Sequence, residues 1–237
     1  MVFKIKNTNM DPHRLSQRMA GFYGITSDKY KELGWDHVKC AQTLLESGVR
    51  TVQLLFNDFP EYGRALEDAR RIRKLCDAHD ALFLITVYHK PLKALALVKD
   101  SDADGMHYHM VSASLGLPLE EGRRQLKGKV MGITVRNGAE AKVAEAAGAD
   151  YVGSDPVFPS LRHRPGNAPI GLEGLKGIVD AVSVPTIAVG GIMPRHLQEI
   201  KRIGAIGFVT MSPVYKPEQG KTPESVVAEY MKAWNES

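Results

Sequence analysis

Short apolar segments alternate with segments of helical periodicity along the chain, eight times in all. Strands are expected over residues 21–26, 50–56, 81–87, 103–108, 129–135, 149–154, 185–189 and 206–211. Helices are expected over residues 35–47, 61–79, 91–99, 119–126, 139–147, 172–181, 194–203 and 223–234. Regular strand–helix alternation is typical of parallel α/β folds. A length of 237 residues suits a single closed (β/α)₈ TIM barrel.

The main rival fold is an open, doubly wound sheet. That fold would be expected to carry a glycine-rich dinucleotide fingerprint after its first strand. Residues 24–34 contain only Gly24 and Gly34, which do not make such a fingerprint. We therefore expect one barrel domain over residues 21–237, preceded by an N-terminal arm over residues 1–20 that includes a short helix from Pro12.

Composition excludes several classes of protein. The chain is 43% hydrophobic and 24% charged, with a net charge of +4, and its basic residues are spread rather than clustered. This pattern predicts no nucleic-acid partner. No apolar run is long enough for a membrane span, and the N-terminus lacks the features of a secretory signal. We expect a cytoplasmic protein with no membrane partner.

Three apolar segments in the second half end in small or turn-forming residues. They cover residues 151–160, 187–192 and 207–212. Glycine lets the backbone come close to a ligand, and the backbone N–H groups that follow can donate hydrogen bonds to a phosphate. In a barrel, phosphate sites are often built from the loops that follow the last strands. The pattern predicts a phosphate-ester site at this place.

These segments resemble the motifs of the thiamine phosphate synthase family, which includes the related thiazole tautomerase. The resemblance covers roughly residues 21–215, and its most specific part is Pro-Val-Phe-Pro at 156–159. In the synthase, a pyrimidine pyrophosphate loses pyrophosphate, and the nitrogen of a thiazole phosphate attacks the carbocation-like product. The resemblance implies that the thiazole phosphate is held by Gly190, Gly191, Met211 and Ser212, with Gly171 shaping the same rim.

Further contacts with the substrate are expected at the ends of the other strands and in the long loop after residue 155, and the alternative for the basic residues of that loop is a solvated surface. The expected substrate-binding residues are Gln53, Tyr88, Thr134, Ser160, Arg162, His163 and Arg164.

The chain departs from the family where magnesium pyrophosphate would bind. The family motif Gln-Leu-Arg-x-Lys reads Gln-Leu-Leu-Phe-Asn at 53–57, and Asn-Asp-Arg reads Tyr-His-Lys at 88–90. A second magnesium carboxylate would fall near Val111 or Ser112. Magnesium prefers carboxylate and water oxygens. We therefore expect no cofactor, no tight magnesium site and very slow synthesis of thiamine phosphate, unless Asp102, Asp104 or Asp155 takes over as a ligand.

Three histidines are candidates for acid–base chemistry. His107 and His109 share one face of a strand, and His89 is expected at the end of the neighbouring strand. One alternative is a transition-metal site, although no residue is predicted as a metal ligand. Another is a framework role for His107. Arg136 stands where the tautomerase has its histidine base, and Asp155 suits either a base or a turn residue.

The sequence thus predicts a thiamine phosphate synthase-like protein that binds a phosphorylated heterocycle, thiazole phosphate or thiamine phosphate. The family implies a transferase, whereas the changed motifs predict a degenerate pyrophosphate side. Two alternatives stay open: an isomerase or lyase that uses the histidine cluster, and a non-catalytic phosphate-ester-binding protein. As partners we expect a small phosphorylated substrate, and a homodimer stays open.

Overall fold

The structure is a computed structural model that describes residues 11–109, 116–159 and 168–237. Its strands are β1 Gly21–Thr26, β2 Thr51–Phe56, β3 Leu82–Val87, β4 Gly105–His109, β5 Val130–Val135, β6 Tyr151–Ser154, β7 Thr186–Val189 and β8 Gly207–Val209. Its α-helices are α1 Pro12–Met19, α2 His37–Glu46, α3 Tyr62–Ala78, α4 Pro91–Ser101, α5 Leu119–Gln125, α6 Gly138–Ala146, α7 Gly171–Val179, α8 Leu197–Ile203, α9 Ser212–Tyr215 and α10 Pro223–Asn235. Two 3₁₀ helices, η1 Asp28–Leu33 and η3 Pro194–His196, precede α2 and α8.

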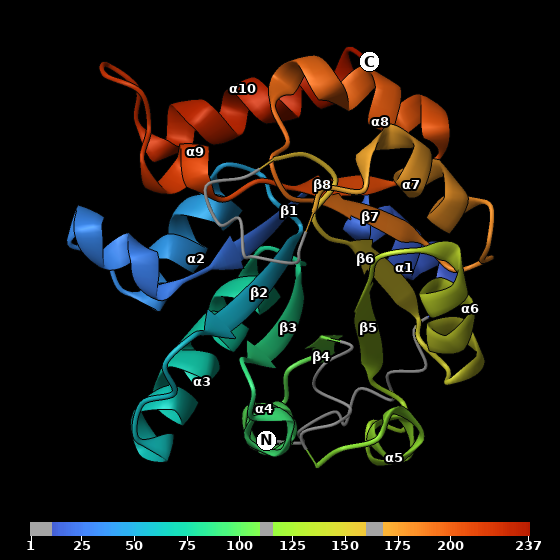
Figure 1. Ribbon diagram of the computed structural model, residues 1–237. Coiled ribbons are helices and arrows are strands. Elements are labelled where there is room, and N and C mark those ends of the chain that lie inside the picture. Colours follow the sequence, from blue (N-terminus) through green and yellow to red (C-terminus); the bar gives the residue numbers. More distant parts are fainter. Residues whose placement is uncertain (1–10, 110–115, 160–167) are drawn as a thin grey trace.

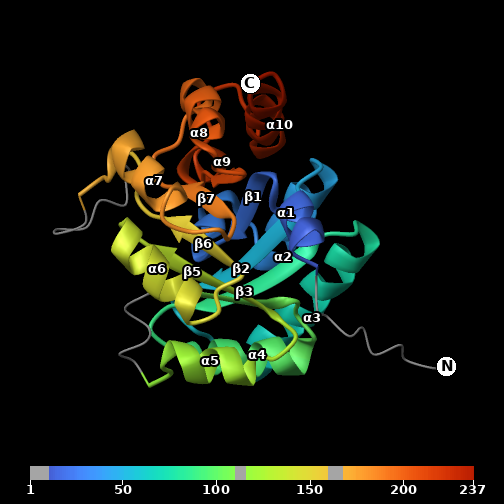
Figure 2. The same cartoon turned by 90° about the vertical axis from the view of Figure 1, so that its right-hand side faces the viewer.

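The eight strands form one closed parallel barrel in sequence order, from β1 to β8. Closure comes from the pairing of β1 with β8, in which Gly21 lies opposite Gly207 and Phe22 opposite Phe208. Most of the helices lie outside the strands and surround them (Figures 1 and 2). The expected (β/α)₈ TIM barrel is confirmed. Among the described residues, no helix is both long and apolar enough to cross a membrane.

The inside of the barrel is filled by side chains from alternate positions of the strands. Residues that point inward form one buried cluster of Tyr23, Leu82, Leu84, Val130, Tyr151, Ile187 and Val209. Leu15 and Met19 of α1 belong to the same cluster, and the backbone carbonyl of Arg18 accepts a hydrogen bond from Thr51 Oγ1 at 2.9 Å. The helix of the N-terminal arm therefore packs against the N-terminal ends of the strands. Residues 1–10 of the arm lie outside the described residues.

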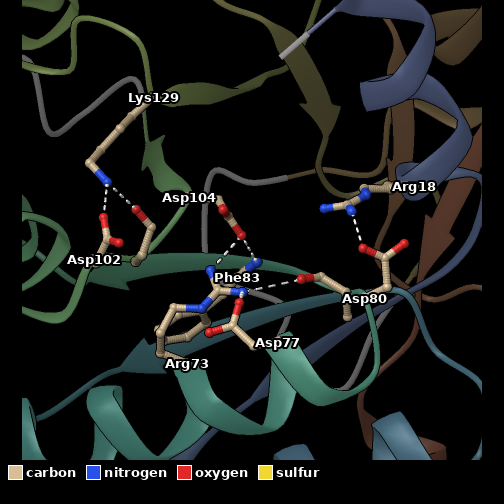
Figure 3. Close-up of polar contacts among 10 residues, drawn as sticks. Arg18, Arg73, Asp77, Asp80, Phe83, Asp102, Asp104 and Lys129 are labelled. Atoms are coloured by element: carbon tan, nitrogen blue, oxygen red, sulfur yellow. Dashed lines mark hydrogen bonds and ion pairs between the residues drawn. The ribbon is translucent and has the colours of Figure 1, made fainter. Parts of the chain in front are cut away.

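Two aspartates, which directly precede β4 and β6, connect strands to helices by the same pair of hydrogen bonds. Asp104 accepts hydrogen bonds from Arg73 Nη1 at 2.6 Å and from the backbone N–H of Phe83 at 2.8 Å (Figure 3). Asp150 accepts hydrogen bonds from Arg123 Nη1 at 2.8 Å and from the backbone N–H of Met131 at 2.7 Å. Each aspartate satisfies one strand N–H and one helical arginine, which explains the repeated Ala-Asp pair at 103–104 and 149–150.

The observed elements differ from the expected ones mainly near their ends. The single helix expected over 194–203 is divided into η3 and α8, because His196 Nδ1 accepts the backbone N–H of Met193 and caps a tighter first turn. The last strand ends at Val209, and α9 begins at Ser212. The short helices η1 and α9 were not predicted, because neither is long enough to show helical periodicity.

Candidate functional site

A cavity of about 910 Å³ lies at the C-terminal ends of the strands. Each of the eight strands contributes to its lining, either directly or through the residues that follow it. This is the end of a TIM barrel at which active sites are found, and the volume suits a small organic ligand.

The floor of the cavity is a chain of hydrogen bonds between buried polar side chains. Tyr23 Oη donates to Gln53 Oε1 at 2.7 Å and lies 2.9 Å from Tyr151 Oη. Tyr151 Oη lies 2.8 Å from His107 Nδ1, and His107 Nε2 lies 2.7 Å from Thr134 Oγ1. Burial raises the pKa of both phenols, which therefore keep their protons. The chain links five strands and fixes the position of the His107 ring.

His107 is a neutral imidazole in this setting. Its side chain is buried, and burial, followed by the charge of nearby His109, lowers its pKa to about 3. Both ring nitrogens already have hydrogen-bond partners, Tyr151 and Thr134. This geometry supports the framework role of His107 and leaves neither nitrogen free for a metal ion or a substrate proton.

The lowered pKa of His107 predicts a loss of stability in acid. Between its ordinary pKa of 6.5 and the folded-state value of about 3, the unfolded chain binds more protons at this residue than the folded chain. The free energy of unfolding therefore falls as the pH falls, by about 2 kcal/mol at pH 5 relative to pH 7 from this residue. Urea unfolding at both pH values should show a clearly smaller loss for His107→Gln. The exposed His13→Gln serves as control, and equal losses in His107→Gln and the wild type would contradict the assignment.

The β7–β8 side of the cavity carries the residues expected to bind phosphate. Val189 lies opposite Val209 in the barrel, so the residues just beyond them, Gly190 and Gly191 on one strand and Met211 and Ser212 on the other, lie side by side. Arg195 and Lys216 line the same side, and so does Lys221, which is paired with the lining carboxylates of Glu218 at 3.5 Å and Glu229 at 2.7 Å. Backbone N–H groups beyond two strand ends, together with a hydroxyl group and cations, make an arrangement that suits an anion.

The two glycines also have a packing role. Their φ angles are +93° at Gly190 and +66° at Gly191, and a Cβ at Gly191 would lie 2.4 Å from the carbonyl oxygen of Pro159. The loop after β6 is held against them, because Val157 N–H donates to Val189 O at 2.8 Å and Phe158 N–H donates to Gly190 O at 3.1 Å. Side chains at these positions would push the loop away from β7.

The opposite side of the cavity, at β2–β4, is lined by apolar and aromatic groups. Leu55, Tyr88 and His109 line it, and the rings of Tyr88 and His109 lie with their centroids 4.6 Å apart. In the part of the chain that the structure describes, no group of three or more His, Cys, Asp or Glu residues is placed to hold a metal ion. The two sides of the cavity therefore differ in chemistry.

The structure brings most of the expected site residues together. The cavity lining includes Gln53, Tyr88, His107, His109, Thr134, Asp155, Gly190, Gly191, Met211 and Ser212. Three expected residues are not part of this lining: His89 is exposed beyond β3, Arg136 donates to Ala168 O at 2.7 Å, and the N–H of Gly171 donates to Val157 O at 3.0 Å. Ser160, Arg162, His163 and Arg164, as well as Val111 and Ser112, lie outside the described residues.

Sequence reasoning missed two groups of site residues. Tyr23 and Tyr151 were expected only as parts of strands, yet both belong to the buried hydrogen-bond chain. Arg195 and Lys216 were not singled out, although each follows one of the phosphate segments by only a few residues. That short spacing was the available signal for the two cations.

Sequence comparison shows which family of known proteins this chain resembles. The family model for thiamine monophosphate synthase matches residues 22–214. A thiamine-phosphate synthase from Caldivirga maquilingensis is 34% identical over 217 residues, which cover 92% of this chain and 98% of that protein. The thiamine-phosphate synthase of Archaeoglobus fulgidus is 33% identical, with 83% and 88% covered.

Among solved structures, a thiamine phosphate pyrophosphorylase from Pyrococcus furiosus superimposes with a TM-score of 0.78 at 27% identity, over 94% of this chain and 98% of that one. The family model and the curated relatives together cover the barrel from its first strand to the loop after its last. The chain belongs to the thiamine monophosphate synthase family.

Proposed function

We propose that this protein binds the phosphate ester of a thiamine-related heterocycle, thiazole phosphate or thiamine phosphate, and that its synthase activity is very slow. Membership of the family supports a role in thiamine metabolism. The observation that carries the finer proposal is the difference between the two sides of the cavity. The β7–β8 side has backbone donors and the cations Arg195 and Lys216, whereas the described residues Leu55, Tyr88 and His109 make the β2–β4 side apolar and aromatic.

The phosphate is assigned to the β7–β8 side. Backbone N–H groups of Gly190 and Gly191 and the hydroxyl of Ser212 supply directional donors, and Arg195 and Lys216 supply positive charge at the same side. Charge-assisted hydrogen bonds are about twice as strong as neutral ones. A single phosphate is therefore well served by these groups.

A magnesium-bound pyrophosphate is poorly served by the other side. Leu55 and Tyr88 offer it neither cations nor carboxylate oxygens, and desolvating so high a charge without partners is costly. Asp155 also lines the cavity and is the residue most able to substitute as a ligand. Asp155 by itself falls short of the octahedral oxygen set that magnesium demands.

A proton-transfer enzyme that uses the histidine cluster is less well supported. His107 is engaged at both ring nitrogens, and His89 lies outside the cavity lining. His109 also lines the cavity, but a single histidine of the cluster is weaker support for proton transfer than three converging ones.

The phosphate assignment predicts the effect of Ser212→Ala. Calorimetric titration with thiazole phosphate should show saturable binding to the wild type and about tenfold weaker binding to Ser212→Ala, the cost of one hydrogen bond to a charged group. Ser16→Ala, in α1 at the other end of the barrel, is the matched control and should bind like the wild type. The proposal fails if thiazole phosphate, thiamine phosphate and inorganic phosphate all leave the wild type without heat of binding, or if Ser212→Ala binds unchanged.

A further inference from the structure

The hydrogen-bond chain on the cavity floor has a fixed direction, and the residue that fixes it lies outside the cavity. Thr86 of β3 is buried and does not line the cavity. Its Oγ1 lies 2.8 Å from the backbone carbonyl oxygen of His107, which can only accept, so the Thr86 hydroxyl must donate there. Its proton is thereby committed to one partner.

The hydrogen bond that Thr86 donates to the His107 carbonyl determines the orientation of the Gln53 amide. Gln53 has its side-chain nitrogen 3.0 Å from Thr86 Oγ1, and the threonine oxygen is left to accept at this contact. The NH₂ group of Gln53 therefore faces Thr86, and its Oε1 faces Tyr23. The amide oxygen can only accept, so Tyr23 donates its hydroxyl proton to it at 2.7 Å.

The same reasoning passes along the rest of the chain. Because the hydroxyl of Tyr23 donates its hydrogen bond to Gln53, Tyr151 must be the donor in the 2.9 Å contact between the two tyrosine hydroxyls. Tyr151 Oη then accepts from His107, which places the ring proton on Nδ1. Nε2 carries no proton, so it accepts the hydroxyl proton of Thr134 at 2.7 Å. The neutral state that burial imposes on His107 is the state this arrangement requires.

The hydrogen-bond chain ends at Thr134, which lines the cavity. Its direction determines whether the Thr134 hydroxyl donates a hydrogen bond to a ligand or accepts one from it. Thr134 donates its hydroxyl hydrogen bond to His107, so the Thr134 oxygen presents lone pairs to the cavity. A ligand carbonyl at this place would meet those lone pairs, or would take the proton and leave His107 Nε2 without a donor. A ligand N–H adds a hydrogen bond and removes none.

We propose that Thr134 accepts a hydrogen bond from an N–H donor of the bound heterocycle, such as an exocyclic amino group, and that Thr86 sets this preference from outside the cavity. The inference rests on the proposed function, because it concerns the heterocycle whose phosphate binds at β7–β8. Thr86 is a positioning residue that acts through Gln53, Tyr23, Tyr151 and His107.

The test compares thiamine phosphate, which carries an amino group on its pyrimidine ring, with oxythiamine phosphate, in which that group is replaced by oxygen. The wild type should bind the amino ligand about tenfold or more tightly than the oxo ligand, as expected for one hydrogen bond exchanged for an unsatisfied group. In Thr86→Val the amide of Gln53 loses its anchor and can turn over, which reverses every donor along the chain. The preference should then fall to near parity, and ¹⁵N spectra should show His107 losing its purely Nδ1-protonated form.

Thr51→Val is the matched control. Thr51 is also a buried threonine that donates to a backbone carbonyl, but it lies outside both the chain and the cavity lining. The ratio of the two affinities should stay at the wild-type value in this variant. An unchanged ratio in Thr86→Val, with both ligands weakened equally, would overturn the inference, as would a wild type that prefers the oxo ligand or binds both alike. Those outcomes leave the proposed function standing, whereas an absence of binding by thiazole phosphate as well would refute the proposed function itself.

Discussion

Replacement of Asp104 by alanine is expected to lower the free energy of unfolding by about 3–5 kcal/mol, the usual cost of removing one partner of a buried ion pair. The side chains of Asp104 and Arg73 are only 13% and 12% exposed. Without the carboxylate, the Arg73 guanidinium stays buried close to the Ala81 carbonyl, and the backbone N–H of Phe83 loses its acceptor (Figure 3). A buried arginine left with only the half-exposed Asp77 carboxylate, together with an unsatisfied strand N–H, makes this the largest loss of stability that we expect from one substitution.

The control is a second aspartate on the same arginine. Asp77 pairs with Arg73 Nη2 at 3.0 Å, but its side chain is 52% exposed. Solvent screens such a pair, so Asp77→Ala should cost less than about 1 kcal/mol. Urea unfolding at neutral pH measures both variants. Equal effects of the two substitutions would show that burial does not decide the contribution of Asp104.

Gly191→Ala is expected to weaken the binding of thiazole phosphate by about a hundredfold, because displacements of about 1 Å in a binding site can have effects of this size. The added Cβ would lie 2.4 Å from the carbonyl oxygen of Pro159 and 2.6 Å from that of Phe158, and both are backbone atoms that cannot turn away. Either the loop after β6 moves, or the Gly191 backbone leaves its φ of +66°. Both responses displace the N–H groups assigned to the phosphate.

Gly177→Ala is the matched control for this substitution. Gly177 lies within α7, and a Cβ there would meet no atom within 4 Å. Alanine favours a helix interior over glycine by about 1 kcal/mol, so this variant should be slightly more stable and should bind like the wild type. Calorimetry with thiazole phosphate and a thermal unfolding curve for each variant check both statements. Wild-type affinity in Gly191→Ala would remove the glycine pair from the phosphate site.

The barrel could be predicted from the sequence because its signals are local. Each strand is a short apolar run, and helical periodicity follows it, so order and type of the elements were readable one segment at a time. The β7–β8 side of the cavity was predicted only in part. The glycines after β7 were visible as a motif, whereas Arg195 reaches the cavity because η3 begins shortly after them.

The buried chain on the cavity floor could not be predicted in this way. Tyr23 and Tyr151 are 128 positions apart, and only the closure of the barrel brings their hydroxyls to 2.9 Å. The role of Asp104 and Asp150 became visible only in the structure, where each accepts hydrogen bonds from a strand N–H and from a helical arginine. Long-range polar contacts depend on register and closure, which local patterns do not specify.

The central claim is that, among the described residues, the cavity offers cations to a ligand at its β7–β8 side, and one calorimetric experiment tests it directly. The protein is first saturated with thiazole phosphate and then titrated with pyrophosphate in the presence of magnesium. We predict saturable heat in the first stage, from the phosphate at Gly190, Gly191 and Ser212, and no binding heat in the second, because Leu55 and Tyr88 offer neither cations nor carboxylates. Tight, magnesium-dependent binding of pyrophosphate to the saturated protein would contradict the account.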